Sequence, residues 1–306
     1  MIRFILRRTL QIIPVLIGIA MLVFGMLHLI PGDPARIVAG IEASEETIEI
    51  ARENLGLNKP LYEQFFTFIG NVIKGDLGTS IQSGTPVTEE LAVRFPITMK
   101  IALGATAFAT VIGMLAGVLA ATRQNKFIDN FIMVTSLIAV SVPSYFLGLL
   151  LLIVFSLKLG WLPVFGINTP MHYVLPIVTL GMQSMGLIAR MTRSSMLDVI
   201  RQDYIRTAKA KGLSEMVIIY FHALQNALIP VITVVGLKFG GLLAGTILVE
   251  VVFSIPGVGR YMVDAILNRD YPVVQGAILV VASSFVIVNI LVDIAYKLAD
   301  PKIRYD

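Results

Sequence analysis

Six apolar stretches, each about as long as a membrane is thick, dominate this chain of 306 residues. An α-helix rises 1.5 Å per residue, so roughly 20 apolar residues cross the ~30 Å hydrocarbon core of a bilayer. Only 14% of the residues are charged, whereas a soluble domain carries about 25%. The sequence therefore predicts an all-α, polytopic membrane protein with six transmembrane helices. These helices are expected at residues 9–30, 97–122, 131–157, 174–194, 228–252 and 277–298.

Basic side chains gather in the short polar segments, which predicts how the chain is oriented, because cytoplasmic loops collect Lys and Arg. The long segment between the first two apolar stretches instead has an acidic excess. We expect an uncleaved first helix that starts in the cytoplasm, and six crossings return the C-terminus to the cytoplasm. The basic residues expected on the cytoplasmic side are Arg3, Arg7, Arg8, Arg123, Lys126, Arg193, Arg201, Arg206, Lys209, Lys211, Lys302 and Arg304.

Three parts follow from this pattern: a first transmembrane helix at 1–30, a helical extracytoplasmic insertion at 31–96, and a core of five transmembrane helices at 97–306. Within the insertion, Ser44 is expected to cap one helix that ends near Gly56. A second amphipathic helix is expected between Pro60 and Gly75. These helices lie flat on the membrane, cover a cavity or form a packed cap without a specific role.

Small residues on one helix face indicate where helices approach each other closely in lipid. Such faces contain Gly113 and Gly117 in the second span, and Gly236, Gly240 and Ala244 in the fifth. Gly241 and Gly245 share a neighbouring face of the fifth span. Packing within the chain, a wall of a permeation path and contact with a second subunit all fit this pattern. Pro143 is expected to kink the third span.

Sequence signals for catalysis are weak. The chain lacks the GxxxxGK[ST], GxSxG and HExxH motifs, and it contains no cysteine. Its histidines, His28, His172 and His222, are far apart in the sequence. We therefore predict no catalytic residues, no ATP site of the P-loop type and no metal site in this chain.

Charged residues at membrane depth are costly unless they are paired or hydrated. Lys238 lies within the fifth span and Glu250 near its outer end, about 18 Å apart along a helix. Each either lines a substrate path or has a structural role, by snorkelling to the interface or capping a loop. Gln183 and Ser184 are weaker candidates for the path. The segment 254–276 is expected to form a turn, a short helix and a turn, and its Pro256 and Asp264 are candidates for an outer gate.

A polar segment at 195–227 separates two apolar stretches and predicts a docking surface. Apolar and basic residues interleave before Gly212, and Ser214 is a candidate N-cap for a second helix. A basic helix of this kind inserts into the groove of a partner protein or binds anionic lipid. The residues expected in this docking loop are Asp203, Tyr204, Arg206, Thr207, Ala208, Lys209, Lys211, Gly212, Leu213 and Ser214.

The segment TAKAKGLSE…HALQNALIP resembles the permease subunits of ATP-binding-cassette (ABC) importers, in the branch that carries dipeptides, oligopeptides, glutathione and nickel. The general family signature is Glu-Ala-Ala, three residues, Gly, nine residues and Ile-x-Leu-Pro. Ala208 and Gly212 match it, whereas Arg206 and Thr207 stand in place of Glu-Ala. Further segments similar to the branch are HLIPGDPA (28–35), LGLNKPLYEQF (55–65), GDLGTS (75–80), LGWLPVFG (159–166), FSIPGVGR (253–260), RDYPVVQ (269–275) and DPKIRY (300–305).

The resemblance implies a bacterial or archaeal cell-membrane protein that works only in a complex. A second homologous permease subunit would complete the path, and two separate ATPase subunits would bind ATP and magnesium. The loop around Ala208 would be the coupling helix seated in an ATPase groove, and an extracellular or periplasmic solute-binding protein would deliver the substrate. Peptides are the expected cargo, with glutathione or a metal chelate as alternatives. Two other classes are an ion-gradient-driven secondary transporter and an intramembrane enzyme.

Overall fold

The computed structural model describes residues 2–29, 34–40, 43–54 and 56–299. Apart from one isolated bridge between Thr79 and Pro86, every regular element of these residues is helical, which confirms the predicted all-α class. Residues 30–33 of the HLIPGDPA segment and the DPKIRY segment at 300–305 lie outside the described residues.

Four helices of the described chain are long and apolar enough to cross a membrane. A fifth crossing is added if the bent pair formed by residues 127–158 is one span, and α1 (Ile2–Leu29) contributes a shorter apolar helix at Leu10–Met26. The predicted number of six therefore stays a prediction. The four long helices are Val87–Thr122, Met171–Ile200, Glu215–Val252 and Tyr271–Val292.

The chain divides into two compact units, and the first contains residues 1–95 and 261–284. In it, α1 packs against α4 (Leu61–Ile73), where Phe24 lies 5.5 Å from Phe65 between ring centroids. The Ser44 hydroxyl accepts the Thr47 N–H at 3.2 Å and caps α3 (Glu45–Asn54), as the sequence predicts. The remaining elements are α2 (Pro34–Ala39), the start of α5 (Val87–Thr122), most of α12 (Val258–Leu267) and the first half of α13 (Tyr271–Ala299).

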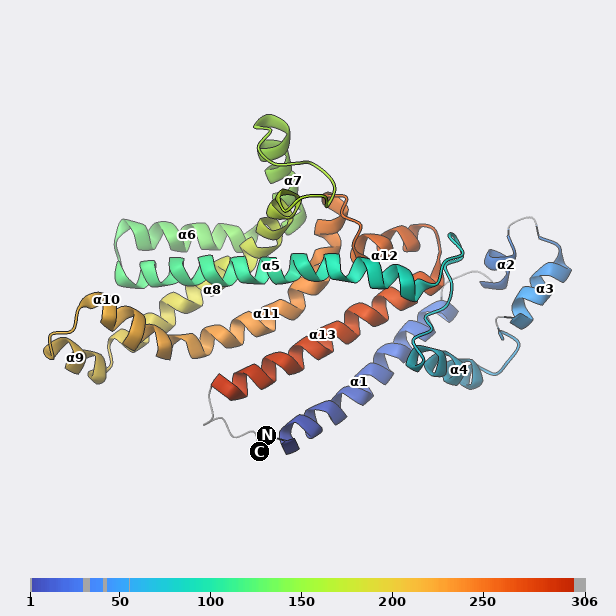
Figure 1. Ribbon diagram of the computed structural model, residues 1–306, viewed down its shortest axis with the longest axis horizontal. Helices are drawn as coiled ribbons and strands as arrows, with labels where there is room; N and C mark the ends of the chain where they lie inside the picture. Colours follow the sequence, from blue (N-terminus) through green and yellow to red (C-terminus); the bar gives the residue numbers. More distant parts are fainter. Residues whose placement is uncertain (1, 30–33, 41–42, 55, 300–306) are drawn as a thin grey trace. The chain divides into compact units, whose positions relative to one another are not determined.

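The second unit contains residues 96–260 and 285–306, and α8 (Met171–Ile200) lies at its centre. Helices α5, α6 (Phe127–Ser141) and α11 (Leu224–Val252) pack against α8 (Figure 1). A Cβ atom on Gly117 of α5 would lie 2.6 Å from the Ala189 carbonyl oxygen of α8, so this glycine face packs within the chain. The other elements are α7 (Ser144–Leu151), η1 (Leu152–Lys158), α9 (Asp203–Ala210), α10 (Glu215–Val217) and η2 (Ile218–Ala223).

The third predicted span, 131–157, is broken and not merely kinked. Helix α6 ends at Ser141, and α7 leaves it at an angle of 107° (Figure 1). Proline disfavours helical geometry at the residue before it and has no N–H of its own. Val142 and Pro143 are accordingly both extended, with ψ angles of 125° and 137°. The position of the break was predicted, but its size was underestimated.

The helix expected from Ser214 toward Ala227 and the fifth span expected at 228–252 are not separate helices. One continuous helix, formed by α10, η2 and α11, runs from Glu215 to Val252 and passes through Pro230. Proline is tolerated inside membrane helices where other groups satisfy the backbone carbonyl that it leaves free, and the π turn η2 ends seven residues before Pro230. Similarly, residues 195–200 are the last turns of α8, so the docking loop itself is short.

A glycine at the α6–α8 crossing gives a direct test of this packing. A Cβ atom on Gly186 would lie 2.6 Å from the Ser136 carbonyl oxygen, which belongs to the α6 backbone. We expect Gly186→Ala to lower the free energy of unfolding by about 1–3 kcal/mol, as overpacking does. Thermal unfolding of the purified protein in detergent measures the effect.

Gly241→Ala is the matched control, because no atom lies within 4 Å of the Cβ position on Gly241. This variant should keep the wild-type midpoint or raise it slightly, since alanine is the better helix former. Equal midpoints for the two variants would contradict the observed α6–α8 contact.

Candidate functional site

The predicted docking loop contains one helix, α9, between two turns. Helix α9 spans Asp203–Ala210, and Gly212 ends it with a φ angle of +79°, which a glycine adopts without strain. The Leu213 N–H donates to the Ala208 carbonyl oxygen at 3.4 Å, the bond expected of a glycine-terminated helix. Ser214 occupies the predicted N-cap position before α10, but its hydroxyl makes no capping hydrogen bond. The helix–glycine–helix pattern is thus present.

One face of α9 is buried against its own chain. Ile205 is fully buried, and Ala208 is 8% exposed. Both belong to an apolar cluster that includes Met196 and Val199 of α8 and Ala223 of η2. Ala208 therefore faces the interior of the second unit, and the expectation that it contributes to a docking surface is wrong for the side chain.

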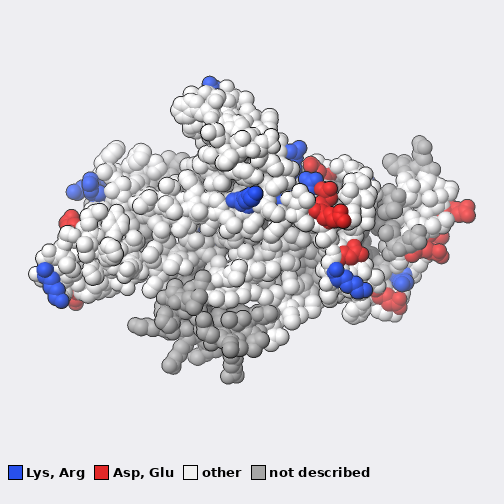
Figure 2. All heavy atoms as spheres, in the orientation of Figure 1, with Lys and Arg blue, Asp and Glu red and all other residues white. Residues whose placement is uncertain are grey.

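The opposite face of α9 is exposed, and its charged residues are Arg206 and Lys209 with Asp203. Arg206 lies 3.6 Å from Asp203, with both side chains at least 80% exposed, so this ion pair leaves the surface open to solvent. Figure 2 shows both basic and acidic side chains at the end of the second unit where α9 lies. The exposed residues of the predicted docking loop are Asp203, Tyr204, Arg206, Thr207, Lys209, Lys211, Gly212, Leu213 and Ser214.

A buried carboxyl group joins three elements at the other end of α11. Glu250 is fully buried, and its Oε1 accepts the Thr98 hydroxyl of α5 at 2.6 Å. Its Oε2 accepts the Arg260 N–H at 3.1 Å, and the Thr98 oxygen accepts the Val258 N–H at 3.0 Å. These two N–H groups lie in the first turn of α12, where no partner within the helix is available. Glu250 therefore anchors the start of α12 to α5 and α11.

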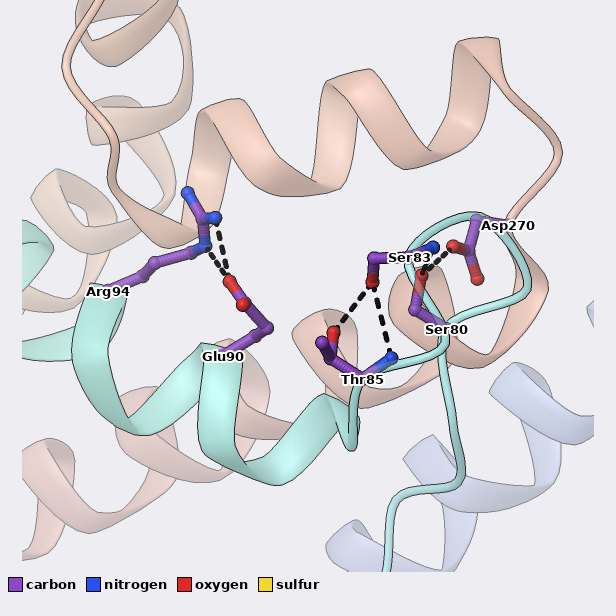
Figure 3. A network of polar contacts seen from close by, with 6 residues as sticks. All are labelled: Ser80, Ser83, Thr85, Glu90, Arg94 and Asp270. Carbon is purple, nitrogen blue, oxygen red and sulfur yellow. Dashed lines mark hydrogen bonds and ion pairs between the residues drawn. The ribbon is translucent and has the colours of Figure 1, made fainter.

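A second buried carboxylate organises the first unit. Asp270, in the turn between α12 and α13, accepts the Ser80 hydroxyl at 2.5 Å (Figure 3). It also accepts the N–H groups of Ile81 and Gln82 at 3.2 and 3.3 Å. The structure thus brings together the GDLGTS and RDYPVVQ segments, which lie far apart in the sequence. These partly buried backbone donors are satisfied, and the loop after Thr79 is held in place.

Next to this network, Glu90 and Arg94 of α5 form an ion pair at 2.7 Å (Figure 3). The Arg94 guanidinium carbon lies 4.3 Å from the centre of the Tyr261 ring, a cation–π contact. Burial, and then the Glu90 carboxylate, raise the pKa of Tyr261, so its phenol is neutral at physiological pH. These contacts fix the first turns of α5 and leave no free acid–base pair among the described side chains of the network.

The other residues predicted for a path or gate are dispersed. The Gln183 side chain donates to the Val142 carbonyl oxygen at 2.8 Å and so binds a carbonyl at the α6 break. Ser184 is buried, whereas Lys238 is exposed on α11, far along the helix from Glu250. Pro256 lies in the turn that contacts Glu250, and Asp264 is exposed on α12. The structure brings together only Glu250 and the turn around Pro256.

Sequence reasoning assigned Gln183 to a path and Arg193 to the cytoplasmic side, and missed that both reach α6 or its C-terminal end from α8. Arg193 forms a bidentate ion pair with the buried Asp129 at 2.5 and 2.7 Å, which joins the two helices. One turn away, the Nε of Arg190 is buried and has no hydrogen-bond partner in the part of the chain that the structure describes. Positions 183, 186, 190 and 193 recur every three or four residues, so this periodicity is the signal that marks them as one helix face.

Two family models match the chain. The model described as "Binding-protein-dependent transport system inner membrane component" matches residues 113–305, and its N-terminal counterpart, "Binding-prot-dependent transport system membrane comp, N-term", matches residues 1–102. Together they cover both units. The described residues include no group of three side chains able to hold a metal ion.

Curated relatives match along the entire chain. The glutathione transport system permease protein GsiC of Escherichia coli strain K12 is 45% identical over 305 residues, and GsiC of Pectobacterium atrosepticum is 46% identical over 305 residues, with full coverage of both chains in each case.

Solved structures show the same fold. The MetNI methionine ABC transporter in inward-facing conformations matches with a TM-score of 0.59 at 19% identity, over 69% of this chain and 96% of that chain. An amino acid ABC transporter with histidines matches with a TM-score of 0.53 at 14% identity, over 71% of this chain and 95% of that chain. This chain belongs to the family of binding-protein-dependent transport system inner membrane components, the permease subunits of ABC importers.

Proposed function

We propose that this chain is a permease subunit of an ATP-driven importer of glutathione. The proposal of glutathione as substrate rests on the identity of 45% over the whole chain to permeases of glutathione transport systems. The same observation favours glutathione over the dipeptides and oligopeptides expected from the sequence. A metal chelate has no comparable support.

The partners follow from the class of transporter. A second permease subunit completes the path, two ATPase subunits bind ATP and magnesium, and a solute-binding protein delivers the substrate from outside. In this arrangement both termini of the chain and α9 lie in the cytoplasm of a bacterial or archaeal cell. The basic bias of the short loops supports this orientation.

Helix α9 is the part of the chain that docks on the ATPase. Its apolar face is occupied by its own chain through Ile205 and Ala208, so the exposed basic face is available to a partner. A helix held at its base and exposed on one face suits insertion into a groove. An acidic rim on that groove would complement the basic face and speed association.

We expect the double variant Arg206→Glu/Lys209→Glu to weaken binding of the ATPase subunits at least about tenfold, because like charges would then meet at the docking surface. Pull-down of the ATPase subunits with the tagged chain in mild detergent measures the loss. Substrate-stimulated ATP hydrolysis should fall in parallel.

The control makes the same charge change elsewhere. Arg123→Glu/Lys126→Glu alters two exposed residues in the turn between α5 and α6. This variant should bind the ATPase normally. Equal binding by both double variants and the wild type would show that the basic face of α9 does not dock, and equal loss in both would indicate a general effect of charge.

Uptake by the complete complex in proteoliposomes tests the substrate. With the cognate binding protein, radiolabelled glutathione should accumulate only when ATP is present and should be insensitive to an uncoupler of ion gradients. Uptake of dipeptides without glutathione would replace the proposed substrate. Uptake that follows the ion gradient and ignores ATP would identify a secondary transporter.

A path-lining and a structural role for Glu250 make different predictions. In Glu250→Gln an NH2 group replaces one carboxyl oxygen. Because this group donates hydrogen bonds, either the Thr98 hydroxyl or the Arg260 N–H loses its acceptor. We expect the free energy of unfolding to fall by about 1–3 kcal/mol, the cost of a buried donor left unsatisfied. Thermal unfolding in detergent measures it.

Lys238→Gln serves as the comparison, since Lys238 is exposed on the same helix and should tolerate the change. A Glu250→Gln protein of wild-type stability but with altered uptake kinetics would return Glu250 to the substrate path and contradict the structural role.

A further inference from the structure

We propose that Tyr204 and Asn226 are positioning residues that fasten the docking helix α9 to the long helix Glu215–Val252, so that movement of α9 is transmitted to α11. This inference rests on the proposed docking of α9 on an ATPase. It concerns a different step, namely how the displacement leaves α9 and reaches the membrane-spanning part of the chain.

The contact is a closed triangle of hydrogen bonds. The Asn226 side-chain amide donates to the Tyr204 hydroxyl oxygen at 2.8 Å and to the His222 carbonyl oxygen at 3.1 Å. The Tyr204 hydroxyl donates to the same carbonyl at 3.3 Å. One member therefore lies on α9, and the other two lie on the long helix, 18 and 22 residues further along the chain.

The triangle lies where the long helix departs from regular geometry. Residues Ile218–Ala223 form a π turn, and the carbonyl that both side chains bind belongs to His222 within it. π turns inside α-helices occur frequently at functional sites, because the regular ladder of hydrogen bonds is interrupted there. The interruption makes the long helix less regular here, and Tyr204 and Asn226 both bind the His222 carbonyl near the C-terminal end of the turn.

Apolar packing alone does not fix the rotation of α9 about its own axis. Ile205 and Ala208 bury one side of α9 in the cluster with α8 and η2, which holds the helix down but allows it to roll about its axis. Tyr204 lies beside this buried stripe and is 39% exposed. A directional bond at this position fixes the roll angle of α9. When a partner covers the exposed face, water is excluded, and a hydrogen bond gains strength in the lower dielectric.

The consequence is a continuous mechanical connection. The long helix that begins beside α9 continues through the π turn and Pro230 to Glu250, which binds Thr98 of α5 and the first turn of α12. A displacement applied to α9 and passed on through the triangle therefore reaches the opposite end of α11. Without the triangle, part of the displacement would be lost as rotation of α9 on its apolar base.

The test measures substrate uptake and ATP hydrolysis together in the complete complex in proteoliposomes. Tyr204→Phe keeps the ring and removes only the hydroxyl, and Asn226→Leu removes the amide. Each should lower the amount of glutathione transported per ATP about threefold to tenfold, the range that corresponds to loss of one such hydrogen bond. The double variant should be no worse than the stronger single variant, because the residues act as a unit.

Tyr220→Phe is the matched control. Tyr220 lies on the same π turn, is 41% exposed, and its hydroxyl forms no hydrogen bond within the described part of the chain. Its transport per ATP should equal that of the wild type. Wild-type coupling in both Tyr204→Phe and Asn226→Leu, with the ATPase subunits bound, would overturn the proposal.

Restoring the link by other means provides a second test. The chain has no cysteine, so Tyr204→Cys/Asn226→Cys introduces the only reactive thiols. A short bis-maleimide should restore coupling to this double variant, and failure to restore it after complete cross-linking would contradict a fastening role.

Loss of ATPase binding in Tyr204→Phe would assign Tyr204 to the docking surface instead. Absence of any ATPase bound to the wild-type chain would refute the proposed function itself.

Discussion

Close approach of helix backbones around α8 is the constraint on which the second unit depends. Lipid tails are as apolar as the side chains themselves, so moving an apolar side chain from lipid into a helix interface gains little free energy. Helices in a membrane therefore associate through van der Waals contact and interhelical hydrogen bonds. Gly117 of α5 and Gly186 of α8 lie against backbone carbonyl oxygens of the facing helix, with no room for a side chain. Once the backbones are this close, the polar groups of α8 can reach α6 directly, as Gln183 and Arg193 do.

Buried polar groups in this chain mainly join elements of structure. Each unsatisfied polar group in an apolar environment costs several kcal/mol by transfer scales, so such groups are retained where they have partners. Glu250 satisfies the first turn of α12, Asp270 satisfies a loop, and Asp129 pairs with Arg193. A polar residue inside a predicted span is therefore ambiguous from sequence alone, because its partner lies on another helix and cannot be seen in a single stretch.

The sequence was most informative where local chemistry decides the geometry. Ser44 caps a helix, Pro143 breaks one and Gly212 ends one, and each of these effects depends on neighbouring residues only. It was less informative at Pro230, where a helix passes through a residue that normally ends helices. The inward orientation of Ala208 was missed because the short α9 has two possible faces, and only its packing on α8 shows which one is buried.

The single helix from Glu215 to Val252 connects the two ends of the core. Its 38 residues span about 57 Å at 1.5 Å per residue, more than the thickness of a bilayer. One end packs against α9, and the other carries Glu250 and its bonds to α5 and α12. A helix of this length transmits displacement only as far as it stays straight, and its irregular places are η2 and Pro230. Both lie in the half of the helix nearer α9, so α-helix with no further proline or π turn leads from there to Glu250.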